Sequence, residues 1–183
     1  NIGRQLFVTS EIGTNKAVTL VSRYNYHFGL EWHAKPERFL PTQWFNGGNL
    51  IVISAVDTRK SRAEIRNAMS KYPHAYFIDS GCGLDFGQVY CGNGLPELPY
   101  PWVNHPELYD PTLDEPEHSS CSAADALEHH GLFINQFIAT GVLEIIWQLF
   151  RNGGLDYSEL YFNLKNGRMI PQMIEIPVMK KAA

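Results

Sequence analysis

Cysteine is scarce in this chain, and long apolar runs are absent from it. The 183 residues hold three widely spaced cysteines, Cys82, Cys91 and Cys121. This odd, scattered set argues against a disulfide-stapled secreted domain and is typical of reduced thiols in a cytoplasmic protein. No run of eighteen apolar residues occurs, so the sequence predicts no membrane-spanning helix.

Basic residues are also too few for a positively charged surface. The formal net charge is −4 at pH 7, which argues against binding of nucleic acid through its phosphates. The amino end carries neither an initiator Met nor a signal-peptide pattern. With 44% hydrophobic and 13% aromatic residues, the chain has enough apolar side chains for one sizeable core.

The hydrophobic pattern alternates between strand and helix. Helical spacing of apolar residues is found at 15–25, 61–71 and, with an interruption near 129–131, at 121–150. Strand patterns are found at 30–35, 49–56, 75–79, 87–91, 160–164 and 169–176. The last two flank a turn at 165–168, which predicts a C-terminal β-hairpin. The whole order predicts an α/β fold with a mostly parallel, Rossmann-like sheet flanked by helices.

Asp57 stands where such a sheet binds ligands, at the carboxyl end of a strand. It directly follows the apolar run 50–56, and Arg62 comes five residues later in the first turn of the next expected helix. A carboxylate in this position can hold Mg²⁺, which prefers oxygen ligands and nucleotide phosphates. The alternative is an aspartate that caps the helix and pairs with Arg62.

Two cations near the amino end indicate a similar ligand. Arg4 lies beside an apolar pair, at the edge of a core, and Lys16 lies in a turn that leads into a helix. Cations held in this way suit a polyanion such as a nucleoside triphosphate. The alternative is that both side chains merely extend over apolar surface.

Five segments of the chain resemble the motifs of a known family. They are 1–7 (N-L-x-R-Q), 12–17 (I-G-x-x-K-A), 55–62 (T-D-N-x-x-x-R), 80–89 (G-x-x-G-Q-V) and 133–136. In order and spacing the first four resemble the ThiF/MoeB/HesA family, the bacterial relatives of ubiquitin-activating enzymes. The fifth is similar to the subgroup encoded in PRTRC cassettes. In the third motif Val56 replaces Thr and Thr58 replaces Asn.

The resemblance implies an activity, cofactors and partners. Family members use ATP and Mg²⁺ to adenylate the C-terminal carboxylate of a small ubiquitin-like (β-grasp) protein, and they commonly form homodimers. Cofactor-binding roles are implied for Asn1, Arg4, Gln5, Lys16, Asp57 and Arg62. Asp57 would hold Mg²⁺, and Arg62 would anchor Asp57 or touch phosphate. Arg4 would reach across a dimer and stabilise phosphate charge on the nucleotide bound to the other subunit.

Departures from the family leave a second function open. The glycine-rich phosphate loop, the first two strands and the acidic residue that grips the ribose precede the first motif in the family and have no counterpart here. We therefore expect residues 1–183 to form a partial adenylation domain that lacks at least one βαβ unit of roughly 30 residues. The alternative is a catalytically inactive scaffold of the same fold that binds a protein partner.

The sequence argues against an oxidoreductase function and against a zinc site. A dinucleotide-dependent oxidoreductase is disfavoured, because no G-x-G-x-x-G occurs. Many relatives bind zinc through two C-x-x-C pairs, and because neither pair is present, we expect no zinc site.

Cys121 is a further candidate, as a reactive thiol. Residues 122–125 read as a capping box, which places Cys121 at a helix amino end, where the helix dipole lowers the pKa of a thiol. Some relatives use a cysteine at this position for covalent transfer. The alternative is a buried structural cysteine.

Residues 92–120 hold six of the eleven prolines and are longer than an ordinary connection. In the family this region is a crossover loop over the adenylate, and the alternative is a solvated acidic linker.

Residues 132–150 are apolar nearly all round. Such a helix needs cover on most sides, and a second subunit is the simplest cover. The alternatives are the hairpin or the missing amino-terminal unit.

Overall fold

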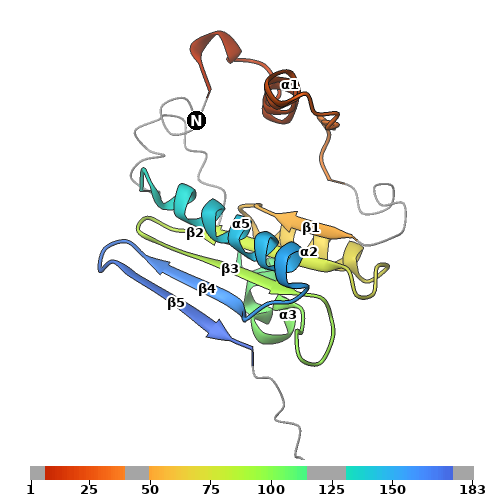
Figure 1. The fold of residues 1–183 in the computed structure, drawn as a ribbon, viewed down its shortest axis with the longest axis vertical. Coiled ribbons are helices and arrows are strands. Elements are labelled where there is room, and N and C mark those ends of the chain that lie inside the picture. Colours follow the sequence, from red (N-terminus) through yellow and green to blue (C-terminus); the bar gives the residue numbers. More distant parts are fainter. Residues whose placement is uncertain (1–6, 40–49, 115–130, 175–183) are drawn as a thin grey trace, which may run out of the picture.

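A five-stranded sheet forms the centre of the protein in a computed structural model that describes residues 7–39, 50–114 and 131–174. The strands, in spatial order, are β1 (Ile51–Ser54), β2 (Tyr76–Cys82), β3 (Phe86–Gly92), β4 (Tyr157–Asn163) and β5 (Arg168–Met173). The helices are α1 (Lys16–Phe28), α2 (Arg59–Met69), α3 (Pro101–Asn104) and α5 (Ile134–Asn152). Three short 3-10 turns are η1 (Thr9–Glu11), η2 (Pro106–Tyr109) and η3 (Pro111–Leu113). Figure 1 shows the strands side by side with α5 across them.

The sheet is mixed, so the prediction of a mostly parallel sheet is wrong for the described strands. Only β1 and β2 pair in parallel, and the other three neighbouring pairs are antiparallel. The connection through α2 is long enough for a parallel return. The turns at 83–85 and 164–167 are too short for one, and such turns join antiparallel strands. The α/β class itself and the antiparallel pairing on either side of 165–168 are present.

One expected strand is missing, and another is shorter and more exposed than expected. Residues 30–35 form no strand, because the Asn25 side chain takes both backbone groups of Trp32, at 2.9 Å and 2.8 Å. At the start of the sheet, β1 covers only 51–54, and Ile53 is 51% exposed. The continuous apolar run at 49–56 predicts a strand covered on both faces, and this expectation is wrong for β1, which lies at the edge of the sheet among the described strands.

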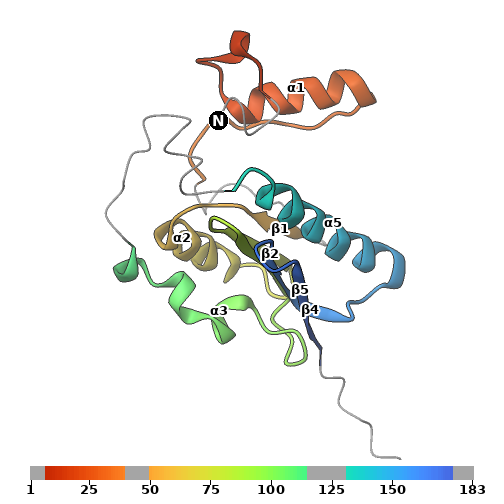
Figure 2. The same cartoon turned by 90° about the vertical axis from the view of Figure 1, so that its left-hand side faces the viewer.

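Helices cover the two faces of the sheet. Figure 2 shows α5 on one side and α2 and α3 on the other. Along α5, Ile134, Ile138 and Ile145 face the sheet at helical spacing. Gly141 lets the helix approach closely, since a Cβ there would lie 2.8 Å from Phe162. The helix ends at Gly153, whose φ of 69° is the left-handed conformation that glycine adopts easily.

Residues 93–114 pack on the α2 face of the sheet. Tyr109 is fully buried, and the Trp102 ring lies 5.4 Å from that of Phe77 and 5.6 Å from that of Tyr109. For this stretch the solvated-linker alternative is wrong. Its continuation at 115–120 and the Cys121 region lie outside the described residues. No helix in the described ranges is both long and apolar enough to cross a membrane.

Candidate functional site

Several strand ends share one rim of the sheet. The strands β1 and β2 end there, and the registers place Gly81 opposite Gln88 and Gln88 opposite Tyr161. Asp57 follows β1 on this rim, directly before α2. The rim is therefore the carboxyl end of the parallel pair, where open α/β sheets bind ligands.

Asp57 itself is exposed and takes part in no hydrogen bond or ion pair with any described residue. The cap of α2 is Thr58, whose side-chain oxygen accepts from the Ser61 amide at 3.1 Å. The helix-capping alternative for Asp57 is therefore wrong. Its carboxylate is free to ligate a cation, and Mg²⁺ is commonly held by one or two carboxylates together with substrate phosphates.

Arg62 is committed elsewhere, so its expected pairing with Asp57 is wrong. Its Nε donates to Asp79 Oδ2 at 3.0 Å, and its second guanidinium nitrogen donates to the Ser80 carbonyl at 3.0 Å. The side chain is 8% exposed. Arg62 lies on the face of α2 that packs on the sheet, so its guanidinium reaches β2 rather than the loop at Asp57.

Asp79 is a buried carboxylate that the sequence reasoning missed. Its Oδ2 also accepts from the Tyr109 hydroxyl at 2.8 Å, while Oδ1 has no partner among the described residues. Burial and the nearby Asp79 charge raise the pKa of Tyr109 far above its usual value, so the hydroxyl stays protonated. Ser54 Oγ, on the neighbouring strand, is also buried without a partner in that part of the chain. In the sequence, the one sign of this site was a single carboxylate, Asp79, at the end of an apolar strand pattern.

The amino end of α2 already binds an anion from the chain itself. The Asp114 carboxylate accepts from the Arg59 and Lys60 amides at 2.8 Å and 2.9 Å. The Arg59 guanidinium donates to the carbonyls of Leu113 at 2.8 Å and Glu107 at 3.2 Å. These bonds tie the end of segment 93–114 to the helix start beside Asp57.

The structure does not join Lys16 to this rim. Lys16 is the first residue of α1, a helix without buried residues, and it forms no hydrogen bond or ion pair with described residues. Asn1, Arg4, Gln5 and Cys121 lie outside the described ranges. Of the six expected cofactor-binding residues, only Asp57 and Arg62 are therefore placed at the same end of α2.

A second polar cluster lies on the α2 face of the sheet, and the sequence reasoning missed it too. His105 Nε2 lies 2.9 Å from Glu159 Oε1, and the Tyr161 hydroxyl donates to Glu159 Oε2 at 2.5 Å. The His105 ring packs 4.5 Å from that of Tyr90. Burial, followed by the bond to Glu159, raises the pKa of Tyr161. The cluster fixes the segment around α3 onto β4, and no local sequence pattern signals it.

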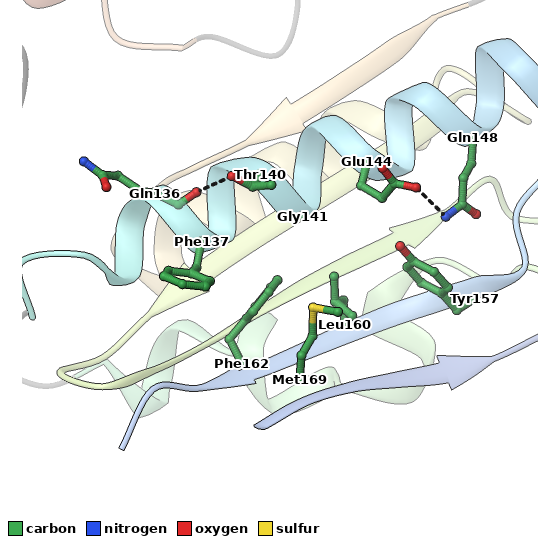
Figure 3. Close-up of a pocket in the computed structure, with 10 residues that line it drawn as sticks. All are labelled: Gln136, Phe137, Thr140, Gly141, Glu144, Gln148, Tyr157, Leu160, Phe162 and Met169. Carbon is green, nitrogen blue, oxygen red and sulfur yellow. Dashed lines mark hydrogen bonds between the residues drawn. The ribbon is translucent and has the colours of Figure 1, made fainter. Parts of the chain in front are cut away.

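A groove of about 670 Å³ lies between α5 and the strands β4 and β5. Figure 3 shows Phe137 pointing from the helix toward Phe162 and Leu160 of the sheet, with Met169 at the open side. Gln148 Nε2 donates to Glu144 Oε1 at 3.3 Å near one end of the groove, and Gln136 and Thr140 lie near the other end. The groove is on the α5 face of the sheet, opposite the cluster of Arg62 and Asp79.

No three His, Cys, Asp or Glu side chains in the described part of the chain lie close enough to hold a metal ion together. Comparisons of the chain with known protein families and with curated protein sequences found no match.

Proposed function

We propose that the protein is an ATP- and Mg²⁺-dependent adenylyltransferase that activates the C-terminal carboxylate of a small ubiquitin-like protein in the cytoplasm. The observation that carries the proposal is the exposed Asp57 carboxylate at the carboxyl end of β1, which pairs with no described residue. Support comes from the motif resemblance. The proposal requires a Rossmann-like phosphate loop, which the described residues do not contain. The open outer edge of β1 offers a place for such a unit.

The reaction joins two anions and therefore needs cations. A carboxylate oxygen of the partner attacks the α-phosphorus of ATP, the bond to the β-phosphate oxygen breaks, and pyrophosphate leaves. In this proposal Asp57 holds Mg²⁺ on the phosphates, and Lys16 and Arg4 neutralise charge as it develops. Arg4 comes from the second subunit of a homodimer. Asn1 and Gln5 supply polar contacts, and Cys121 is a candidate thiol for a later transfer step.

The rim explains why Asp57 would be well placed. Arg62 and Asp79 fix α2 onto β2, and Asp114 fixes the end of segment 93–114 on the start of α2. The loop that carries Asp57 is therefore held between packed elements. A ligand held on rigid elements needs less reorganisation when the metal and phosphates bind.

Calorimetric titration with Mg·ATP tests this proposal without the protein partner. We expect full-length protein to bind Mg·ATP and Asp57→Ala to weaken binding at least tenfold, or by about 1.4 kcal/mol. Glu97→Ala, which removes an exposed carboxylate from the loop before α3, should bind like the wild type. Equal affinity of Asp57→Ala and wild type would sink the assignment of Asp57.

A catalytically inactive scaffold that binds a protein partner is the second candidate. One observation favours it: two of the groups near Asp57 that could contact phosphate are already occupied. Arg62 is buried against Asp79, and Asp114 covers two amides at the amino end of α2. Full-length protein that fails to bind Mg·ATP in the same titration would support this candidate over the enzyme.

A further inference from the structure

The groove between α5 and the strands β4 and β5 has no cover in the described chain. All six residues of β5 are exposed, and on the groove side Met169 is 63% exposed. The floor of the groove is apolar, and the volume of the groove lies in the range of ligand-binding sites. An open apolar surface of this kind marks an interaction site.

The amphipathic helix α1 lies against only a short neighbouring segment among the described residues, where the Trp32 ring is 6.0 Å from that of Tyr24. None of the α1 residues is buried, although Leu20, Val21, Tyr24 and Phe28 form an apolar stripe at helical spacing. The helix is nevertheless well formed. Asn15 caps its start by accepting from two amides, and Gly29 ends it in the left-handed conformation. Figures 1 and 2 both show α1 apart from the sheet.

The helix and the groove complement each other. The thirteen residues of α1 form a rod about 20 Å long, a suitable size to lie beside α5 over β4 and β5. Lys16 borders the apolar stripe on one side, where Arg23, seven residues later, is already paired with Glu11. Glu144 borders the groove and takes part in no ion pair in the described ranges. An apolar stripe bordered by the Lys16 ammonium group thus complements an apolar floor bordered by the Glu144 carboxylate.

The helix of the same chain cannot reach this groove. Trp32 is tied back to Asn25 of α1, and Phe39 packs in the cluster on the α2 face. The seven residues 33–39 span at most about 25 Å. The groove is on the opposite face, and Figure 1 shows α5 between α1 and the strands β4 and β5. A path from Phe39 to the groove crosses three strand spacings and two helix layers, or about 35 Å, which is more than residues 33–39 can span.

We propose that α1 of one copy docks in the α5–β4–β5 groove of a second copy, and that the exchange is reciprocal in a two-fold dimer. The apolar stripe of α1 covers Leu160, Phe162 and Met169, and Lys16 approaches Glu144 of the other copy. This inference rests on the homodimer of the proposed function and is independent of its nucleotide chemistry.

Disulfide trapping between two differently substituted chains tests the exchange. Full-length protein carrying Tyr24→Cys is mixed with protein carrying Met169→Cys and oxidised with copper phenanthroline. We expect a disulfide-linked dimer containing one chain of each kind, since a bond forms only when the Cα atoms come within about 7 Å. The matched control is Tyr26→Cys, on the opposite side of α1 and 94% exposed. Mixtures with wild-type protein measure cross-linking through the native cysteines.

Other results would overturn the proposed exchange of α1 between two copies. A chain carrying both Tyr24→Cys and Met169→Cys that closes a disulfide at monomer mass would show that α1 reaches its own groove. Equal cross-linking of Tyr24→Cys and Tyr26→Cys would show nonspecific contact. No cross-link in a sample that is dimeric by light scattering overturns the exchange but not the homodimer, whereas a monomer overturns both. Neither result bears on Mg·ATP binding, which is measured separately.

A polar substitution in the stripe provides a second readout. Phe28 is 61% exposed within one chain, so Phe28→Asp leaves the fold of the subunit intact. We expect it to raise the dissociation constant of the dimer at least tenfold, while Tyr26→Asp leaves the constant unchanged. Equal dimerisation of the two variants would contradict the docking of α1.

Discussion

On the rim, one carboxylate is exposed to solvent and another is buried among bonding partners. Asp57 is exposed and pairs with no described residue, whereas Asp79 is 1% exposed and held by Arg62 and Tyr109. A buried charge is stable only when it is paired and hydrogen-bonded. Arg62 therefore contributes to the proposed site indirectly, because it fixes the helix that begins beside Asp57.

Removal of the Arg62 side chain should be strongly destabilising. Arg62→Ala leaves the Asp79 carboxylate buried without its counter-charge, so we expect a loss of about 3–5 kcal/mol in the free energy of unfolding. Urea unfolding measures this loss. Arg168→Ala is the control, because that side chain is exposed and makes no ion pair with described residues, and it should change stability by no more than about 0.5 kcal/mol. Similar losses in both variants would contradict the pairing of Arg62 with Asp79.

Cys91 should make stability depend on pH in the alkaline range. Burial raises the pKa of its thiol to about 12, against about 8.5 in an unfolded chain. The unfolded state therefore releases a proton that the folded state keeps. The resulting stabilisation is fully present below pH 8.5 and is lost as the pH rises toward 12.

Comparison of wild type with Cys91→Ala isolates this thiol. The tyrosines whose pKa values burial raises are common to both proteins and cancel in the difference. Between pH 8.5 and 10 we expect wild type to lose about 1–2 kcal/mol more than the variant. Urea unfolding at several pH values provides the measurement, and parallel pH profiles would contradict burial of the thiol.

At the scale of elements, the contact between α5 and the sheet depends on glycines at close approaches. A Cβ on Gly87 of β3 would lie 2.2 Å from Ile138 Cδ1 and 2.9 Å from the Gly81 carbonyl oxygen. Strand β3 can therefore pack under α5 only without a side chain at this position.

Gly87→Ala should accordingly cost about 1–3 kcal/mol in thermal or urea unfolding, as overpacking does. Adding Ile138→Val removes the nearest methyl group and should restore part of the loss. The matched control is Gly154→Ala, where a Cβ would meet no atom within 4 Å and φ is not positive. Equal stability of Gly87→Ala and Gly154→Ala would show that α5 is farther from β3 than described.

At the scale of the whole molecule, one side of α5 remains uncovered in the described chain. Leu143, Trp147 and Phe150 follow each other at helical spacing and are 65%, 61% and 77% exposed. The hairpin is not their cover, since β4 and β5 belong to the sheet on the other side of the helix. The stripe fits an interface between two copies.

Light scattering should therefore give about twice the chain mass of 20.8 kDa at micromolar concentration. Leu143→Asp places a charge in the stripe and should shift the protein toward monomer. Asn152→Asp, an exposed change on the same helix, should leave the dimer unchanged. Monomeric wild-type protein would rule out the homodimer.

The sequence by itself determined the features that depend on neighbours along the chain. Helical spacing predicted α1 and α2, and the turn at 165–168 predicted the antiparallel pair β4 and β5. The apolar surface of α5 could also be predicted from the order of its residues, because apolar side chains such as Leu143 and Phe150 occur beyond the positions that one sheet-facing stripe needs. Asp57 was found because it follows an apolar run.

Only the tertiary structure decided the strand directions and the polar partners. Arg62 meets Asp79 across 17 residues, and His105 meets Glu159 across 54. Local periodicity carries no information about such distant pairs, which form only when the sheet brings the strands together. The alternation at residues 30–35 suits a strand, but in the structure the Asn25 side chain bonds both backbone groups of Trp32. Buried polar groups are almost always hydrogen-bonded, and the folded chain decides which partners lie within reach.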